Sequence, residues 1–208
     1  RVTPIYQVSG FNAPAFIYSQ ITVLLGFKSE RHEGKITGLA AHGNPHSCDK
    51  NFRQLMDFQN GSFKVFKPLR KDHTIYKEIL KYSREDIAAS LQYVFEDIIT
   101  KYVRHYAIKT KKTRIALSGG VFANVKVNQK IAELENVSAV FVYPNMGDGG
   151  NMIGAFYAYQ KSVQRPINDV YYGPSFSNVD IKKVLDSLNL IYRYYPDIEK
   201  KTAELLSE

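Results

Sequence analysis

The longest regular pattern of apolar and polar positions lies between residues 87 and 106. Apolar residues recur there at intervals of three and four over about six helical turns. They are Ile87, Leu91, Val94, Phe95, Ile98, Ile99, Tyr102, Val103 and Tyr106. This spacing predicts a long helix that packs one face on the protein core. Ser83, with Asp86 three residues later, predicts the N-terminal cap of this helix.

Shorter patterns predict the elements that precede this helix. Asn12 and Pro14 signal a helix start, and the apolar face that follows ends at Gly26. The remaining expectations are a packed segment over 36–41 behind an exposed charged stretch, a short helix over 52–58, a turn at Asn60-Gly61, a strand over 62–66, and a polar-faced helix or loop over 71–82.

Two strand–turn–helix units follow the long helix. The first has a strand over Arg114–Leu117, a Ser-Gly-Gly turn and a helix over Val121–Leu134. The second has a strand over 140–143, a turn over 144–150 and a helix over 151–163. Parallel strands joined by helices are typical of α/β folds, so we expect that fold class.

The two turns carry the candidate chemistry. Gly119 and Gly120 permit positive φ and a close approach of the backbone to a ligand. Free N–H groups at the following helix start favour an anion such as phosphate. Asp148 adds a carboxylate in the second turn. A Gly-Gly turn or an Asp beside Gly is also ordinary turn chemistry, and neither standard dinucleotide nor P-loop spacing is present. The pairing of the two turns favours a nucleotide site.

Other polar residues give weaker indications. Lys35, close to Gly38, could place an ammonium group beside a phosphate or a nucleotide hydroxyl. His42 and His46 have the i, i+4 spacing of a helical metal site, but the residues between them include Gly43 and Pro45. We therefore interpret the histidine pair as part of a loop.

Composition restricts the classes of partner. The net charge of +8 favours anionic partners in general. The basic run 109–114 has no interleaved aromatic residues, so we interpret it as a solvated turn and do not expect a nucleic-acid partner. No apolar run is long enough to span a membrane. A single cysteine, Cys48, excludes an intrachain disulfide, fits a reducing cytoplasm, and is expected to be a partly buried thiol without chemistry.

The C-terminal forty residues predict a separate region. Arg165-Pro166 indicates a boundary, and a polar-aromatic linker over 171–177 follows it. We then expect a helix capped by Ser177 and Asp180 that reaches about Leu188, a strand over 190–194, and a helix that begins after Asp197. The chain has no initiator Met and ends within a helical pattern, so we expect a piece of a longer protein.

Four stretches resemble the O-carbamoyltransferases of the nodulation-protein NodU and cephamycin carbamoyltransferase CmcH family. They occur in the family's order and are spread over most of the chain: Glu33–Gly43, Leu117–Asn128, Pro144–Gly150 and Gly173–Ser177. The resemblance implies an actin-like (ribonuclease H-like, ASKHA) nucleotide-binding domain. Residues 1–166 would be its C-terminal half, and residues 167–208 would be the linker and truncated start of a YrdC-like C-terminal domain.

The resemblance also implies a reaction. In this family ATP and carbamoyl phosphate yield a carbamoyl-adenylate in the YrdC-like domain, and the carbamoyl group passes to a hydroxyl of a small metabolite in the actin-like domain. By motif match, the nucleotide phosphates would contact Ser118, Gly119, Gly120 and Asn124, and the ribose or phosphates would lie near Glu33, Lys35 and Gly38. Gly147 and Gly149 would border the nucleotide on both sides of Asp148.

Asp148 matches the catalytic carboxylate that ligates a divalent metal of the iron type beside the nucleotide. The family's H-x-x-x-H metal-binding helix has no match here, so the other ligands would lie outside this chain. We accordingly expect the isolated chain to be inactive.

Two alternatives remain at this point. A threonylcarbamoyl transferase that modifies tRNA shares a similar Ser-Gly-Gly-Val turn, although Phe122 and the Gly173-Pro174 linker favour the first interpretation. A nucleotide-binding scaffold without transfer activity is the other. The acceptor and the oligomeric state, including a homo-oligomer, stay open.

Overall fold

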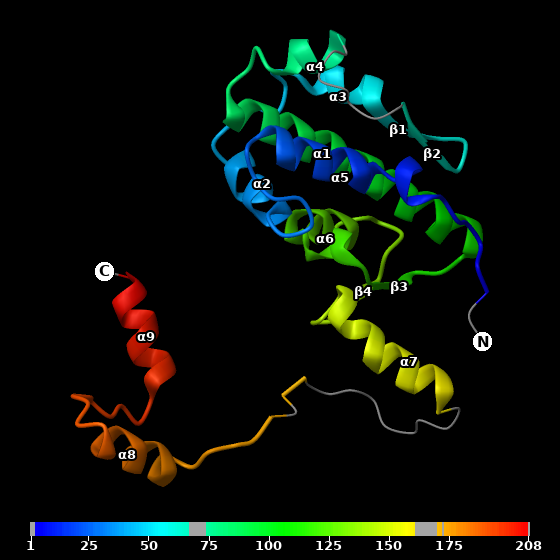
Figure 1. Ribbon diagram of the computed structural model, residues 1–208. Helices are drawn as coiled ribbons and strands as arrows, with labels where there is room; N and C mark the ends of the chain where they lie inside the picture. Colours follow the sequence, from blue (N-terminus) through cyan, green and yellow to red (C-terminus); the bar gives the residue numbers. More distant parts are fainter. Residues whose placement is uncertain (1–2, 67–73, 161–169, 172, 208) are drawn as a thin grey trace. The chain divides into compact units, whose positions relative to one another are not determined.

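The computed structural model describes residues 3–66, 74–160, 170–171 and 173–207 (Figure 1). The chain divides into two compact units, Arg1–Val163 and Gln164–Glu208, and each is described by itself. The first unit is a mixed α/β arrangement, which confirms the expected class at that level. Its relation to the actin-like fold and the assignment of the second unit stay predictions.

The first unit is built around the long helix α5 (Arg84–Thr110) (Figure 1). Ser83 caps it, because its hydroxyl accepts a hydrogen bond from the Asp86 N–H at 3.1 Å. The Asp86 carboxylate binds the Asn44 N–H at 2.8 Å, so it ties the preceding loop to the helix start. The predicted stripe is confirmed as core: its seven buried members are Ile87, Leu91, Val94, Phe95, Ile98, Ile99 and Val103.

Four shorter helices contribute to this core: α1 (Pro14–Leu24), α2 (Glu33–Ala40), α3 (Asp49–Leu55) and α4 (Thr74–Ile79). Each buries at least one large apolar side chain completely, among them Ile17, Ile21, Ile36, Phe52 and Ile79. The expected N-terminal helix and the packed segment around Ile36 are confirmed. A 3₁₀ turn, Gly10–Asn12, precedes α1.

The short helix predicted over 52–58 exists, but its bounds are wrong. α3 ends at Leu55, and Met56–Gln59 forms strand β1, which pairs antiparallel with β2 (Ser62–Val65). The predicted turn is confirmed, since Asn60 and Gly61 both have positive φ, 52° and 78°, as a tight hairpin requires. Hairpin pairing places Phe58 opposite Phe63, with ring centroids 5.4 Å apart, and this tertiary packing outweighs the helical spacing.

The first strand–turn–helix unit differs from expectation at its helix. Strand β3 (Arg114–Leu117) is as predicted and pairs parallel with β4 (Ala139–Val142). Helix α6 (Val125–Ala132) begins four residues later than predicted, after a 3₁₀ turn, η2 (Gly120–Ala123). The delay has a local cause: the Asn124 side chain accepts from the Val127 N–H at 3.2 Å and sets the N-cap there.

The second strand–turn–helix segment consists of β4, a 3₁₀ turn, η3 (Asp148–Gly150), and helix α7 (Asn151–Tyr159). The helix was predicted to reach 163, but it ends at Tyr159 and Gln160 is its C-cap. Residues 161–163, residues 71–73 and the Arg165-Pro166 boundary lie outside the described residues.

The C-terminal unit contains α8 (Asn178–Ser187) and α9 (Ile198–Ser207). The predicted Ser177–Asp180 capping box is confirmed, and the Asp197 carboxylate accepts from the Lys200 N–H at 2.9 Å at the start of α9. The strand predicted over 190–194 is wrong: these residues have no regular secondary structure, and no described strand pairs with them.

Three expectations about the chain's surface and interior can be compared with the structure. Lys111, Lys112 and Arg114 of the basic run are exposed, as expected for a solvated turn. Cys48 is more deeply buried than expected, with 2% of its surface exposed, and this burial raises the pKa of its thiol. None of the described helices is both long and apolar enough to cross a bilayer.

Candidate functional site

A cavity of about 570 Å³ lies beside the two glycine turns. It is lined by residues of α1, the loop before α2, α2 itself, α5, η2, the N-cap of α6 and the start of η3. Its lining residues include Tyr18, Ser19, Glu30, Arg31, Glu33, Gly34, Thr37, Phe95, Gly120, Val121, Asn124, Gly147 and Asp148. Pockets for small ligands measure roughly 300–1,000 Å³, so the cavity has the size of a ligand site.

The structure brings five of the ten predicted site residues to this cavity: Glu33, Gly120, Asn124, Gly147 and Asp148. They come from three separate stretches of the sequence. Their convergence is a tertiary result, while their assignment to a nucleotide stays a prediction.

The other five predicted residues do not line the cavity. The Lys35 ammonium lies 5.6 Å from the centre of the Phe27 ring, and Gly38 is exposed on α2. A Cβ atom built at Gly149 would lie 2.7 Å from the Asn145 side-chain amide, so that side chain would have to shift to admit any other residue. Ser118 and Gly119 lie at the end of β3 and bind another part of the chain.

The two glycine turns are hydrogen-bonded to each other. The Gly119 N–H donates to the Met146 carbonyl at 2.7 Å, and the Ser118 hydroxyl lies 3.4 Å from the same oxygen. Gly119 has φ 106° and ψ 158°, a conformation essentially restricted to glycine, which confirms the predicted positive φ. Gly120 does not have a positive φ. The Gly119 N–H therefore serves the contact between the turns, and Gly120 is the glycine that borders the cavity.

Space beside the lining glycines is available to a ligand. A Cβ atom built on Gly120 or Gly147 would have no protein atom within 4 Å, other than its chain neighbours. Glycine at these positions leaves the backbone approachable from the cavity. This arrangement fits a ligand that contacts main-chain N–H groups, such as a nucleotide phosphate.

The cavity carries charges of both signs. Glu30, Glu33 and Asp148 contribute carboxylates, and Arg31 is the only cation among the described residues that line it. The Glu33 carboxylate accepts from the Ser19 hydroxyl at 2.9 Å and from the Glu30 N–H at 2.6 Å. These bonds hold Glu30 in the left-handed region at φ 64°. The Asp148 carboxylate has no hydrogen-bond partner within the described ranges and is free to act on a ligand.

A buried polar network supports the cavity wall. The Tyr18 hydroxyl donates to Gln92 Oε1 at 2.8 Å, and the Asn124 amide exchanges two hydrogen bonds with the Gln92 amide at 2.9 and 3.1 Å. The pKa of Tyr18 is raised to about 12, mainly by burial. The hydrogen bond from Thr37 lowers this pKa, and the negative charges of Glu96 and Glu33 raise it further. Tyr18 is therefore a neutral hydroxyl group at physiological pH.

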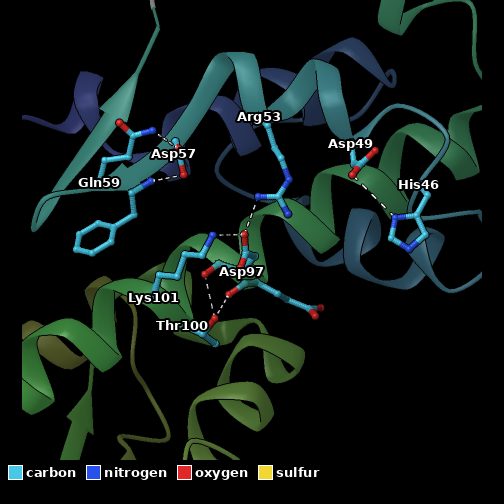
Figure 2. Close-up of polar contacts among 10 residues, drawn as sticks. His46, Asp49, Arg53, Asp57, Gln59, Asp97, Thr100 and Lys101 are labelled. Carbon is cyan, nitrogen blue, oxygen red and sulfur yellow. Dashed lines mark hydrogen bonds and ion pairs between the residues drawn. The ribbon is translucent and has the colours of Figure 1, made fainter.

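The described side chains do not form a metal centre. Among them there is no group of three or more His, Cys, Asp and Glu residues that could hold a metal ion. His42 and His46 lie exposed in the loop between α2 and α3, as the sequence indicated. His46 Nδ1 is instead 3.9 Å from the Asp49 carboxylate (Figure 2). Asp148 alone does not make a site for a divalent ion.

A second polar cluster lies on α5 away from the cavity lining. The Asp97 carboxylate accepts from Arg53 of α3 at 2.7 Å and from Lys101 at 2.8 Å (Figure 2). Burial would raise the Asp97 pKa, but the hydrogen bonds from Lys101 and Arg53 outweigh it, and the pKa is lowered. This cluster joins α3 to α5.

The sequence analysis missed several residues of the cavity wall, among them Tyr18, Ser19, Arg31, Thr37 and the supporting Gln92. One signal was present for Gln92. It lies three residues before Phe95 and seven before Ile99, on the apolar stripe of α5, where a polar side chain needs a buried partner.

Comparison with known proteins gives concordant matches. A family model described as Carbamoyltransferase N-terminus matches residues 11–157. An uncharacterised protein of Methanocaldococcus jannaschii is 32% identical over 192 residues, covering 81% of this chain and 30% of the relative. The nodulation protein NolO of Bradyrhizobium diazoefficiens is 29% identical, covering 70% of this chain and 29% of its own length. The nodulation protein NolNO of Sinorhizobium fredii is 25% identical, covering 86% and 28%. The chain thus spans about a third of the length of these relatives.

Proposed function

Because this chain belongs to the carbamoyltransferase family of the NodU and CmcH type, we propose that its cavity binds the nucleotide of an ATP-dependent O-carbamoyltransferase. The observation that carries the proposal is the convergence of Gly120, Asn124, Gly147 and Asp148 on one cavity. The substrates are ATP, carbamoyl phosphate and a small hydroxylated acceptor. The architecture would be that of an actin-like domain.

The position of the cavity supports a nucleotide. Strands β3 and β4 are parallel, and both cavity-lining turns follow the carboxyl ends of these strands. Ligands of open α/β sheets bind outside these ends, where loops supply backbone N–H groups. The open space beside Gly120 and Gly147 allows a phosphate to approach the backbone.

The proposed transfer needs one carboxylate at the reacting hydroxyl. The acceptor oxygen attacks the carbamoyl carbon of the carbamoyl-adenylate, a new C–O bond forms, and the bond to the adenylate phosphate breaks with release of AMP. The acceptor proton must leave in this step. Asp148 is exposed to the cavity without a partner among the described side chains, so it can accept that proton as a general base.

A divalent metal, of the iron type in the family, would supply Lewis acidity at the carbamoyl carbonyl. The described residues of this chain offer it only the Asp148 carboxylate and do not form a site by themselves.

The test uses the full-length protein that carries this sequence, supplied with ATP, carbamoyl phosphate and ferrous ion. We expect release of pyrophosphate and AMP by the native protein. Asp148→Asn should abolish acceptor carbamoylation while the protein stays folded. Asp186→Asn, a surface substitution on α8, is the matched control and should leave turnover unchanged. Absence of pyrophosphate under all conditions would overturn the proposal.

We also expect the 208-residue chain alone to show no carbamoyl transfer, because adenylate formation is proposed to occur in another domain. The same assay checks this expectation. Transfer by the isolated chain would contradict the proposed division of labour.

A further inference from the structure

Gln92 is a buried amide at the junction of three elements. It lies on α5 with 5% of its surface exposed, contacts Tyr18 of α1, and pairs with Asn124 at the N-cap of α6. Buried polar side chains are rare in this core: Thr22, Ser90 and Gln92 are the buried polar residues within the described part of the chain. Its position beside a cavity-lining residue therefore requires an explanation.

The hydrogen bonds of the Gln92 amide are complete. Its Nε2 group donates to Glu96 Oε1 at 2.7 Å and to Asn124 Oδ1 at 3.1 Å. Its Oε1 atom accepts from the Tyr18 hydroxyl at 2.8 Å and from Asn124 Nδ2 at 2.9 Å. An amide has two donor hydrogens and two acceptor positions, so no capacity remains for a ligand.

The Glu96 carboxylate determines which way this amide faces. An ionised carboxylate only accepts hydrogen bonds, so the NH₂ group of Gln92 must point toward Glu96. The Gln92 oxygen then faces the Tyr18 hydroxyl, whose single hydrogen it receives. The Thr37 hydroxyl, 3.1 Å from the Tyr18 oxygen, becomes the donor in that contact.

The same orientation is imposed on Asn124. Its Oδ1 atom accepts from Gln92 and from the Val127 N–H at 3.2 Å, so both directions require the oxygen on this side. One hydrogen of its Nδ2 group is donated to Gln92. The second Nδ2 hydrogen has no acceptor among the described residues, and Asn124 lines the cavity.

We propose that Gln92 is a positioning residue that, together with the Val127 N–H, holds Asn124 so that it presents an N–H donor to the cavity. The ligand atom at this point must then be an acceptor, such as a phosphoryl oxygen, because the Asn124 oxygen is held away from it. This inference rests on the proposed function, since it assigns the orientation of a side chain in the proposed nucleotide site. Through this amide pair, a buried residue of α5 influences which ligand atoms can bind at the cavity wall.

The first test changes the donor and keeps the cap. In Asn124→Asp the side chain still accepts from the Val127 N–H, since Asp and Asn are equally good N-caps. The donor becomes an acceptor, so ATP affinity of the full-length protein, measured by calorimetry, should fall by about tenfold or more. Affinity for adenosine, which has no phosphate, should be nearly unchanged. Asn178→Asp, on the C-terminal unit, controls for the added charge.

The second test removes the positioning residue. Gln92→Met has a similar volume and no amide, so Asn124 loses two of its hydrogen bonds and is held by the Val127 N–H alone. Its donor is then less firmly placed, and ATP affinity should fall between about threefold and tenfold. Gln129→Met on the exposed face of α6 is the control and should bind ATP as the native protein does. Circular dichroism of each variant reports whether the fold is retained.

The outcomes separate this inference from the proposed function. If the native protein binds no ATP, the proposed nucleotide site falls and the inference falls with it. If the native protein binds ATP and Asn124→Asp and Gln92→Met bind it equally well, the positioning role is overturned while the nucleotide site stands. Equal losses of ATP and adenosine affinity would also overturn the phosphoryl-oxygen assignment.

Discussion

Helix α5 carries two polar clusters that adjoin at Glu96 and Asp97, and they differ in whether their hydrogen bonds leave a donor available to a ligand. The cavity cluster consists of Gln92, Glu96, Tyr18 and Asn124, and the ion cluster consists of Arg53, Asp97 and Lys101. In the ion cluster the charges face one another. In the cavity cluster the hydrogen bonds fix the orientation of the Asn124 amide. One N–H donor of this amide then has no acceptor among the described residues, and Asn124 lines the cavity.

The environment of the two clusters explains this difference. The ion cluster is partly exposed, with side-chain exposures of 35% for Arg53 and 28% for Asp97, so water screens its attraction. Gln92 is buried, so its neutral amide must find every partner inside the protein. When the partners of a buried polar group fix which of its atoms face the cavity, they also indicate which kind of ligand atom can bind there. A partly exposed ion pair such as Arg53–Asp97 mainly joins two helices.

The largest effect should come from breaking the cavity cluster. Gln92→Leu removes the four hydrogen bonds that the amide makes to Tyr18, Glu96 and Asn124, and groups left unsatisfied in the interior cost about 1–3 kcal/mol each before relaxation. We expect the free energy of unfolding to fall by about 3 kcal/mol, measured by urea denaturation. A loss under about 0.5 kcal/mol would show that the network is not tightly coupled to the fold.

The next effect concerns alkaline pH and Tyr18. Its folded-state pKa of about 12 lies above the unfolded value of 10.0, so its contribution is complete below pH 10 and is lost as pH rises toward 12. Between these values the native protein should lose about 2 kcal/mol more stability than Tyr18→Phe. Denaturant curves of both proteins at pH 9, 10, 11 and 12 would check this; parallel pH profiles would contradict the buried-hydroxyl assignment.

A smaller effect is expected from the ion cluster. Arg53→Ala removes one partner of Asp97 and the contact of the guanidinium with the Tyr93 ring, so unfolding should require about 1 kcal/mol less. ATP affinity should be unaffected, because no member of this cluster lines the cavity. A tenfold change in ATP affinity would show that the two clusters are coupled through α5.

The smallest effect should come from Lys101→Ala. This i, i+4 pair with Asp97 has a lysine that is 48% exposed, and such pairs contribute about 0.3–0.5 kcal/mol. The difference from the native protein should shrink further at high salt. A thermal unfolding series at low and high ionic strength measures both quantities.

The sequence predicted local structure correctly wherever a residue's immediate neighbours decide its conformation. The stripe of α5, the Asn60-Gly61 turn, the Ser83 and Ser177 caps, and the positive φ of Gly119 all follow from spacing or from one residue's steric freedom. The apolar spacing from Val121 did not predict the four-residue delay of α6, because the Asn124 cap and not the spacing decides where this helix begins.

Expectations failed where pairing between distant residues decides the structure. Residues 56–59 have helical spacing, but their backbone pairs with β2 and they form a strand. Residues 190–194 have the composition of a strand, but no described strand pairs with them. The β-structure of a short segment depends on its neighbour, which local composition does not specify.

The sequence by itself determined the family, the two glycine turns and the presence of Asp148. Only the tertiary structure decided that Glu33 joins these turns at a cavity while Lys35 and Gly38 do not, and that Gln92 supports Asn124 from the core. The physical reason is the directionality of packing and hydrogen bonding. A motif specifies which groups are available, but the meeting of α1, α2, α5 and the β3 turn decides which of them face the same space.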